Sequence, residues 1–332
     1  MHLNGCHNVR VLQILSVTFP FFALVLCGYL AARRGLLPLA SIPGLNGFVL
    51  FFALPCMLYR FGATTPIAHL MDARVALTYL ACALIMVTLC IAITRRGRIG
   101  WNDAAFGALV AAFPNTGFMG VPLLVALLGA KAAGPAIVTI LVDMVITSSL
   151  CIALSRLDAG QGSSASQAAR NALKGVATNP MPWAILGGAL ASALQITLPK
   201  PVGATLGMLA DAATPVALFT IGAVLARSQM QAATNAAHAV AWREVLPVAA
   251  LKLFLHPVLV WAAGSVVIYC GVALDGFALT VLVLVAALPS ASNVSMLAER
   301  FGADNGRIAR IIMVSTALAF LTFSGAVAWM TA

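Results

Sequence analysis

The feature that most constrains this chain is a series of apolar stretches, many of them near 20 residues long, separated by short segments with charges, Gly or Pro. About 20 apolar residues in a helix cross the hydrocarbon core of a bilayer. Of the 332 residues, 62% are hydrophobic and 8% are charged, whereas a soluble domain carries roughly 25% charged residues. A soluble protein with a large core is therefore disfavoured, and a membrane protein is predicted.

The apolar stretches predict ten transmembrane segments. Backbone groups in lipid find no water, so each segment must satisfy its own hydrogen bonds as a helix, and the fold class is an all-α membrane protein. The first stretch is too long for a secretory signal, and Arg33-Arg34 follows where a cleavage site would need small residues, so we expect it to stay as a span. The predicted spans are 11–32, 43–60, 75–94, 104–129, 135–155, 180–198, 203–226, 245–270, 277–298 and 308–330.

A polar segment divides the spans into two sets of five. It contains the stretch GQGSSASQ, which is typical of a flexible linker. We predict a first five-helix repeat at 1–156, a cytoplasmic linker at 157–178 and a second five-helix repeat at 179–332. Halves with five spans each enter the membrane in opposite senses, which indicates the inverted repeats common in secondary transporters.

Lysines and arginines predict the orientation, because they concentrate in cytoplasmic loops. With the N-terminus outside, the cytoplasmic segments hold 13 of them and the outer segments hold 5. This bias predicts a multi-pass protein of the bacterial inner membrane with both termini in the periplasm. The net charge of +10 is scattered among the loops, so no nucleic-acid partner is expected. The cytoplasmic set is Arg33, Arg34, Arg95, Arg96, Arg98, Arg156, Arg170, Lys174, Arg227, Arg243, Arg300, Arg307 and Arg310.

The seven cysteines show neither a disulfide framework nor a metal-binding pattern. They include no CxxC pair, and all but Cys6 lie in apolar stretches, so we interpret them as small buried apolar residues. No metal site and no cofactor is predicted. A proton or a sodium ion is expected only as a coupling ion. The remaining cysteines are Cys27, Cys56, Cys82, Cys90, Cys151 and Cys270.

Two spans contain matching interruptions. The fourth span carries PNTGFMGVP at 114–122, and the ninth span carries LPSASNVS at 288–295. Proline removes an amide donor and glycine weakens a helix, so both spans are predicted to unwind at mid-membrane depth. Paired interruptions in corresponding spans indicate a transporter binding site, where half-helix N-termini suit a carboxylate. The alternative is that these residues merely kink membrane helices, in which Pro and Gly are frequent.

Four ionisable residues fall within predicted spans: Asp143, Asp211, Lys252 and His256. A charge at the bilayer centre costs at least about 2.5 to 3.5 kcal/mol on insertion scales, so each needs a partner, a cavity or a neutral form. Lys252 and His256 share a helix face, where they would neutralise an anion or exchange protons with it. Alternatively, Lys252 reaches an interface or pairs with an aspartate. Asp143 is a candidate relay for a proton or a cation, or else part of an interhelical pair without a transport role.

The fourth-span pattern resembles that of the auxin efflux carrier family. The pattern is Asn-x-Gly-Phe-x-Gly-x-Pro-Leu from Asn115 to Leu123, and LKLFLHP at 251–257 and the broken ninth span support it. The resemblance covers the whole chain in span count and motif order. Bacterial members resemble carriers of malonate or similar carboxylates, whereas plant members export auxin. The large central loop of the long plant carriers is absent here.

The resemblance implies a ten-helix fold similar to the bile acid sodium symporters, in which the broken helices 4 and 9 cross in a mobile domain. It also implies a scaffold of the first, second, sixth and seventh spans, which forms a homodimer contact. Sodium-binding residues of the symporter branch have no clear match here, so the coupling ion stays open. The implied substrate site has Asn115, Thr116 and Gly117 on one side, Ser290, Ser292 and Asn293 opposite, and the helix-breaking Pro114, Pro122 and Pro289.

The expected function is therefore secondary transport, by symport or a related mode, of a small organic anion such as malonate by alternating access. An intramembrane enzyme is a second hypothesis, but the sequence has no HExxH, no GxSxG and no paired Asp-rich motif. An uncoupled channel is a third, because broken helices also occur in channels. The anion and the lipid bilayer are the expected partners, together with a second copy of the chain.

Overall fold

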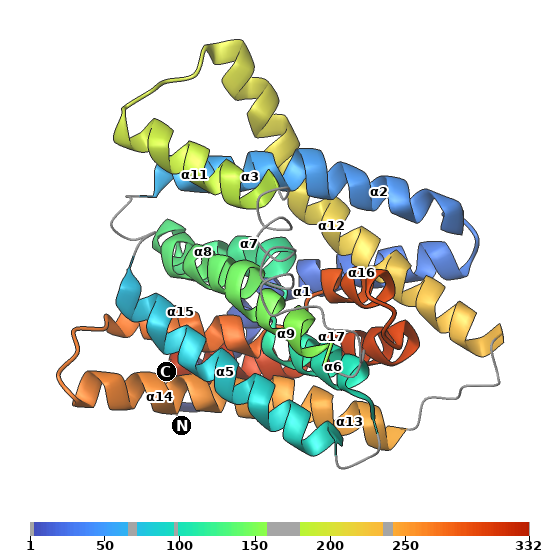
Figure 1. Ribbon diagram of the computed structural model, residues 1–332. Helices are drawn as coiled ribbons and strands as arrows, with labels where there is room; N and C mark the ends of the chain where they lie inside the picture. The colour runs from blue at the N-terminus through green and yellow to red at the C-terminus, as the bar shows by residue number, and fades with distance from the viewer. Residues whose placement is uncertain (1–2, 66–71, 96–98, 158–179, 235–241, 332) are drawn as a thin grey trace.

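The computed structural model describes residues 3–65, 72–95, 99–157, 180–234 and 242–331. Within these ranges the chain forms helices joined by short loops, with no strand beyond one isolated bridge (Figure 1). This confirms the all-α class. Seven segments of the described chain are long and apolar enough to cross a membrane: Ile14–Arg33, Leu39–Thr64, Ala73–Arg95, Ala130–Leu154, Lys200–Met230, Trp242–Tyr269 and Asn305–Met330.

Each predicted span overlaps a helix or a run of helices. In the first half these are α1 (Leu3–Arg33), α2 (Ile42–Phe48) with η2 (Val49–Ala53) and α3 (Leu54–Thr64), α5 (Ala73–Arg95), α6 (Trp101–Ala112) with η3 (Thr116–Gly120) and α7 (Val121–Leu128), and α8 (Ala133–Val142) with η5 (Asp143–Thr147) and α9 (Ser148–Leu154). In the second half they are α11 (Pro180–Ala193), α12 (Lys200–Thr234), α13 (Trp242–Ala250) with η7 (Leu251–Leu255) and α14 (His256–Tyr269), α15 (Gly276–Ala287) with α16 (Asn293–Arg300), and α17 (Asn305–Met330). Short 3₁₀ turns, η1 (Leu39–Ser41) and η4 (Ala130–Ala132), precede α2 and α8.

Four of these segments, η2, η3, η5 and η7, are π-helical turns. Three of them lie inside longer helices, and η3 begins the helix that continues as α7. Three of them lie just before a proline, namely Pro55, Pro122 and Pro257. Proline lacks the N–H that would bond to the carbonyl four residues earlier, and its ring presses on that carbonyl. In all three cases that carbonyl belongs to the middle residue of the π turn. The wider turn therefore accommodates the proline without ending the helix.

The helices pack in two groups. In the first group, α1 packs along α12 and α3 packs along α11, while α12 also contacts α3 (Figure 1). Glycines bring these pairs close: Gly28 and Gly222 join α1 to α12, and Gly62 and Gly188 join α3 to α11. The second group contains α5 to α9 and α13 to α17. The groups meet where α1 and α12 contact α17, α7 and η3.

The core of the second group is formed by the two half-helices that precede the interruptions. Every residue of α6 from Ala104 to Ala112 is buried, and so is every residue of α15 from Val281 to Ala287. Both half-helices end inside the protein, so their terminal backbone groups need partners there. The fold thus brings two helix ends from opposite halves of the chain into one buried region.

Candidate functional site

The two interruptions lie against each other. The Asn115 amide donates to the Pro289 carbonyl at 2.8 Å, and the Ala291 amide donates to the Phe113 carbonyl at 3.0 Å. Pro114 and Ser290 form an antiparallel bridge between these two bonds. The predicted interruptions are therefore present, and each satisfies part of the other's backbone.

Both interruptions are shorter than the sequence predicts. The first covers 113–115, after which residues 116–120 form the π turn η3 and Pro122 lies within α7. The second covers 288–292, and Asn293 begins α16. The expectation of an unwound segment reaching Pro122 was wrong, because the π turn absorbs the missing amide of that proline.

Four polar groups around the crossing are unsatisfied. Within the described residues, the side-chain oxygens of Asn115, Thr116, Ser290 and Asn293 are buried and make no hydrogen bond. A buried polar atom without a partner costs about 1 to 3 kcal/mol. Asn115 and Ser290 lie in the interruptions, and Thr116 and Asn293 begin the helical segments that follow them. All four atoms therefore lie at or next to the crossing, where a ligand with hydrogen-bonding groups would satisfy them.

Open space lies beside Gly117, whereas Gly120 is tightly packed. A side-chain carbon built at Gly117 would meet no atom within 4 Å, but one at Gly120 would lie 2.5 Å from the Leu288 side chain. Gly120 thus lets the two interruptions approach, and Gly117 opens onto free space. A backbone that borders a ligand closely is a common reason for glycine.

The helix starts at the crossing favour an anion. Asn115 precedes η3 and Ser292 precedes α16, and neither side chain caps its helix with a hydrogen bond. The first amides of a helix lack partners in the helix, and its N-terminus carries a partial positive charge. Two such ends meet here. The amides of Thr116, Val294 and Ser295 already donate to nearby carbonyls, so it is the positive ends of the helix dipoles that would favour a carboxylate.

Ser315 of α17 is a third contributor that the sequence did not indicate. Its hydroxyl accepts a hydrogen bond from the Ser290 amide at 3.2 Å and donates to the Ile312 carbonyl at 3.0 Å. The second interruption is thereby attached to α17. A serine in an apolar span is unremarkable in a sequence, so only the fold connects it to the crossing.

Asp143 lies in a buried cluster of polar side chains from α5, η5 and α9. Its carboxylate accepts hydrogen bonds from the Tyr79 hydroxyl at 2.7 Å and the Thr147 hydroxyl at 3.1 Å. The hydroxyl of Ser148 donates to its backbone carbonyl at 2.8 Å. Asp143 is fully buried in the π turn η5, and such turns are frequent at functional sites. Tyr79 was missed because a tyrosine alone in an apolar span gives no signal.

Lys252 links this cluster to the second interruption. Its ammonium donates to the Ala286 carbonyl at 2.9 Å and lies 3.0 Å from His256 Nδ1, and the His256 ring packs 6.0 Å from that of Tyr79. Lys252 is fully buried, so the alternative that it reaches an interface is wrong. Among the described residues it makes no ion pair with an aspartate within 4 Å. A cation at the last carbonyls of α15 offsets the negative end of that helix.

Comparison with known proteins places the chain in a family. A family model described as "Membrane transport protein" matches residues 14–327. The chain belongs to the auxin efflux carrier family of membrane transport proteins. This confirms the resemblance carried by the fourth-span motif.

Curated relatives of this carrier family member extend over almost the whole chain. A protein of Rhizobium meliloti (strain 1021) named "Putative malonate transporter" is 28% identical over 316 residues, which cover 94% of each chain. "Uncharacterized transporter YfdV" of Escherichia coli (strain K12) is 25% identical, covering 85% of this chain and 86% of the relative. An "Uncharacterized transporter" of Methanothermobacter thermautotrophicus is also 25% identical, covering 93% and 94%.

Asp211 and Arg307 of this family member each have a partner outside the crossing. Asp211 of α12 pairs with Arg60 of α3 at 2.6 Å, and both side chains are exposed. Arg307, counted above among loop residues, is instead buried at the start of α17, where its guanidinium donates to the Asp103 carbonyl at 2.9 Å. Gly107 of α6 leaves room for that guanidinium. Counting Lys and Arg between predicted spans cannot reveal this burial, because position along the chain does not show which side chains the fold encloses.

The cysteines of this family member are not uniformly buried. Cys82, Cys90 and Cys151 are buried, as predicted, but Cys27 and Cys270 are exposed and Cys56 is intermediate. Cys6 lies where side chains are not described. The interpretation as buried apolar residues was therefore wrong for Cys27 and Cys270, because an apolar stretch in a membrane protein also has a face toward lipid.

Proposed function

We propose that the protein is a secondary transporter that moves a small carboxylate anion, such as malonate, across the bacterial inner membrane by alternating access. One observation carries the proposal: two helix interruptions from opposite halves of the chain pair with each other and leave four buried polar side chains without partners. The family membership and the name of the Rhizobium relative support it. Among the described residues of the two interruptions, 113–115 and 288–292, no side chain is charged, so helix dipoles and polar side chains would hold the anion.

In this proposal each end of the substrate has a defined partner. One carboxylate lies at the start of η3, next to Asn115 and the open space at Gly117. The other lies near the start of α16, next to Ser290 and Ser292. Hydrogen bonds to a charged group contribute about 1.5 to 3 kcal/mol each, so a few of them offset the loss of hydration. Lys252 adds positive potential through the end of α15.

The motion that we propose is a shift of one helix group against the other. The ten segments would form two inverted five-helix repeats, with α1, α2, α3, α11 and α12 as a scaffold and the second group, which holds the crossing, as the mobile part. Close glycine contacts hold the scaffold pairs together, which supports their moving as a unit. We further propose that two copies of the chain associate through the scaffold, with both termini in the periplasm.

The proposal is tested by counterflow in proteoliposomes. Vesicles loaded with unlabelled malonate are expected to take up labelled malonate transiently above equilibrium, and the label should be recovered chemically unchanged. Saturable counterflow distinguishes a carrier from a channel, and intact label distinguishes it from an enzyme. Uptake that never exceeds equilibrium for malonate, succinate or oxalate would contradict the proposal, as would conversion of the label.

We also propose that the cluster of Asp143, Tyr79, Lys252 and His256 binds the coupling proton. Asp143→Asn keeps the shape and the acceptor for Tyr79 but removes the ionisable carboxyl. The variant should lose accumulation driven by a proton gradient, with the ratio of internal to external malonate falling to about one. Its counterflow, which needs no coupling ion, should continue.

The matched control for this prediction is Asp275→Asn, because Asp275 is exposed and its side chain makes no capping bond to α15. This control should accumulate malonate as the unaltered protein does. Replacing the proton gradient by a sodium gradient tests the other candidate ion. Full gradient-driven accumulation by Asp143→Asn would remove Asp143 from the coupling mechanism.

A further inference from the structure

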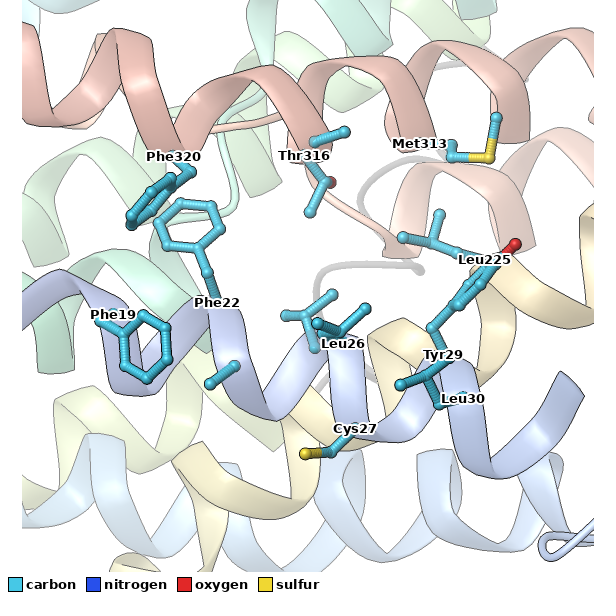
Figure 2. A pocket seen from close by; sticks show the side chains of 13 residues that line it. Phe19, Phe22, Leu26, Cys27, Tyr29, Leu30, Leu225, Met313, Thr316 and Phe320 are labelled. Carbon is cyan, nitrogen blue, oxygen red and sulfur yellow. The ribbon is translucent and has the colours of Figure 1, made fainter. Parts of the chain in front are cut away.

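An apolar groove opens between α1, α12 and α17, at the junction of the two helix groups. Its volume is about 530 Å³, and apolar side chains form nearly all of its walls (Figure 2). Phe19, Phe22 and Phe320 surround one end, and Tyr29, Leu225 and Met313 surround the other (Figure 2). Phe19 and Leu26 are more than half exposed, at 61% and 56%, so the groove opens outward from the protein.

Basic residues lie near the Tyr29 end of this groove, at the end of α1 and on α17. The Arg33 guanidinium donates to the Tyr29 hydroxyl at 2.7 Å, and Tyr29 also bonds to Gln229 of α12. Arg34 is exposed beside it. Arg310 of α17 precedes the groove residue Met313 by three positions, about one helical turn, and so lies on the same side of that helix.

The groove has the depth of one membrane leaflet. Phe19 and Leu30 are 11 positions apart on α1, which at 1.5 Å per residue is about 16 Å. Half of the hydrocarbon core is about 15 Å thick. The arginine end belongs to the set of residues that predicts the cytoplasmic side. In the predicted orientation, the groove would extend from the cytoplasmic headgroup region to about the bilayer centre.

We propose that this groove binds an anionic phospholipid of the cytoplasmic leaflet, with an acyl chain along the phenylalanine and leucine walls and the phosphate at Arg33 and Arg34. The apolar groove, which is as long as one leaflet is deep, matches an acyl chain, and the arginines near its end match an anionic headgroup. Basic pockets between membrane helices on the cytoplasmic side bind such headgroups. A soluble anion would gain nothing from the apolar walls, and a neutral lipid would gain less from the arginines.

The position of the groove suggests a consequence for transport, and this step depends on the proposed function. α1 and α12 are packed backbone to backbone, whereas α17 carries both Thr316, which lines the groove, and Ser315, which bonds to Ser290 at the crossing. A lipid chain between them contacts the helix that supports the substrate site. Its occupancy is expected to change the rate at which the second group moves against α1 and α12.

Binding is tested with the purified full-length protein by native mass spectrometry. Phosphatidylglycerol and phosphatidylcholine with identical acyl chains are compared as probes. The unaltered protein is expected to retain phosphatidylglycerol at least fivefold better. Arg33→Gln with Arg34→Gln should abolish this preference, while the control pair Lys131→Gln with Lys200→Gln, which removes two exposed charges elsewhere, should preserve it. Equal retention of both lipids by the unaltered protein would overturn the proposal.

A second variant tests the apolar part of the site. Ala23→Phe places a ring in the groove and should reduce phosphatidylglycerol retention severalfold without altering the melting temperature. Retention that persists in this variant, or that glycerol phosphate alone displaces, would place the lipid elsewhere. Because these measurements do not involve transport, a protein that binds the lipid but shows no counterflow would contradict only the proposed function.

Discussion

Asn115→Asp should abolish malonate counterflow while leaving the protein folded. The side chain of Asn115 is 3% exposed, and its amide oxygen has no partner among the described residues. Aspartate has nearly the same shape but adds a charge of the same sign as the substrate. Like charges about 4 Å apart repel by about 4 kcal/mol at an effective dielectric constant near 20. Every 1.4 kcal/mol is tenfold in affinity, so roughly a thousandfold loss is expected.

A companion variant, Asn115→Ala, removes the amide without adding charge. Loss of a hydrogen bond to a charged group, at about 1.5 to 3 kcal/mol, predicts a decrease of roughly ten- to a hundredfold in counterflow. The order alanine above aspartate is specific to an anionic substrate. A cationic or neutral substrate would not give that order.

The matched control is Asn305→Asp at the start of α17. The Asn305 amide oxygen accepts from the Ser295 hydroxyl at 2.7 Å, and aspartate keeps that acceptor. A negative charge in the first turn of a helix is also favourable. This variant should transport normally. If Asn115→Asp transports as well as Asn305→Asp, and both elute as folded protein, the substrate does not lie at the crossing.

The sequence located the interruptions because their cause is local. Pro114 and Pro289 remove amide donors wherever they lie, so a break in each helix follows from the residue type alone. The extent of each break depended on its surroundings. Pro122 looks like a further breaker in the sequence, but a π turn retains the helix there.

What the sequence could not predict depends on packing between distant segments. Nothing in the chain indicates that Asn115 and Pro289 share a hydrogen bond, or that Ser315 supports Ser290. Tyr79 and Arg307 were missed for the same reason. In the fold, Tyr79 donates a hydrogen bond to Asp143, and Arg307 donates one to the Asp103 carbonyl of α6. Neither contact is indicated by the residue's surroundings in the sequence. Lys252 was identified because a charge in an apolar stretch is conspicuous, but its role at the end of α15 needed the structure.

Gly28→Ala and Gly222→Ala should each destabilise the protein strongly, because these glycines let α1 and α12 touch. A side-chain carbon at Gly28 would lie 1.8 Å from the Phe219 carbonyl oxygen, and one at Gly222 would lie 1.9 Å from the Val25 carbonyl oxygen. Backbone cannot rotate away as a side chain can, so the helices must separate. We expect a loss of about 3 kcal/mol or more, at the upper end of overpacking effects, measured as a lower melting temperature in detergent.

Gly207→Ala provides the control on the same helix. A side-chain carbon there would meet no atom within 4 Å. Alanine is the better helix former by about 1 kcal/mol, so this variant should be as stable as the unaltered protein or more so. A rise in melting temperature for Gly28→Ala like that for Gly207→Ala would show that α1 and α12 do not pack as described.

The double variant of Gly28 and Gly222 distinguishes this contact from two independent defects. Val25 lies three positions from Gly28 and Phe219 lies three positions from Gly222, so both clashes belong to one crossing of the two helices. Separating the helices to accept the first alanine also makes room for the second. The double variant should therefore lose clearly less stability than the sum of the losses in the two single variants, as expected for residues that share one backbone shift. Full additivity would mean that each alanine is accommodated by a separate local shift of α1 or α12. Helices that adjust independently would be poorly suited to act as one rigid body against which the crossing moves.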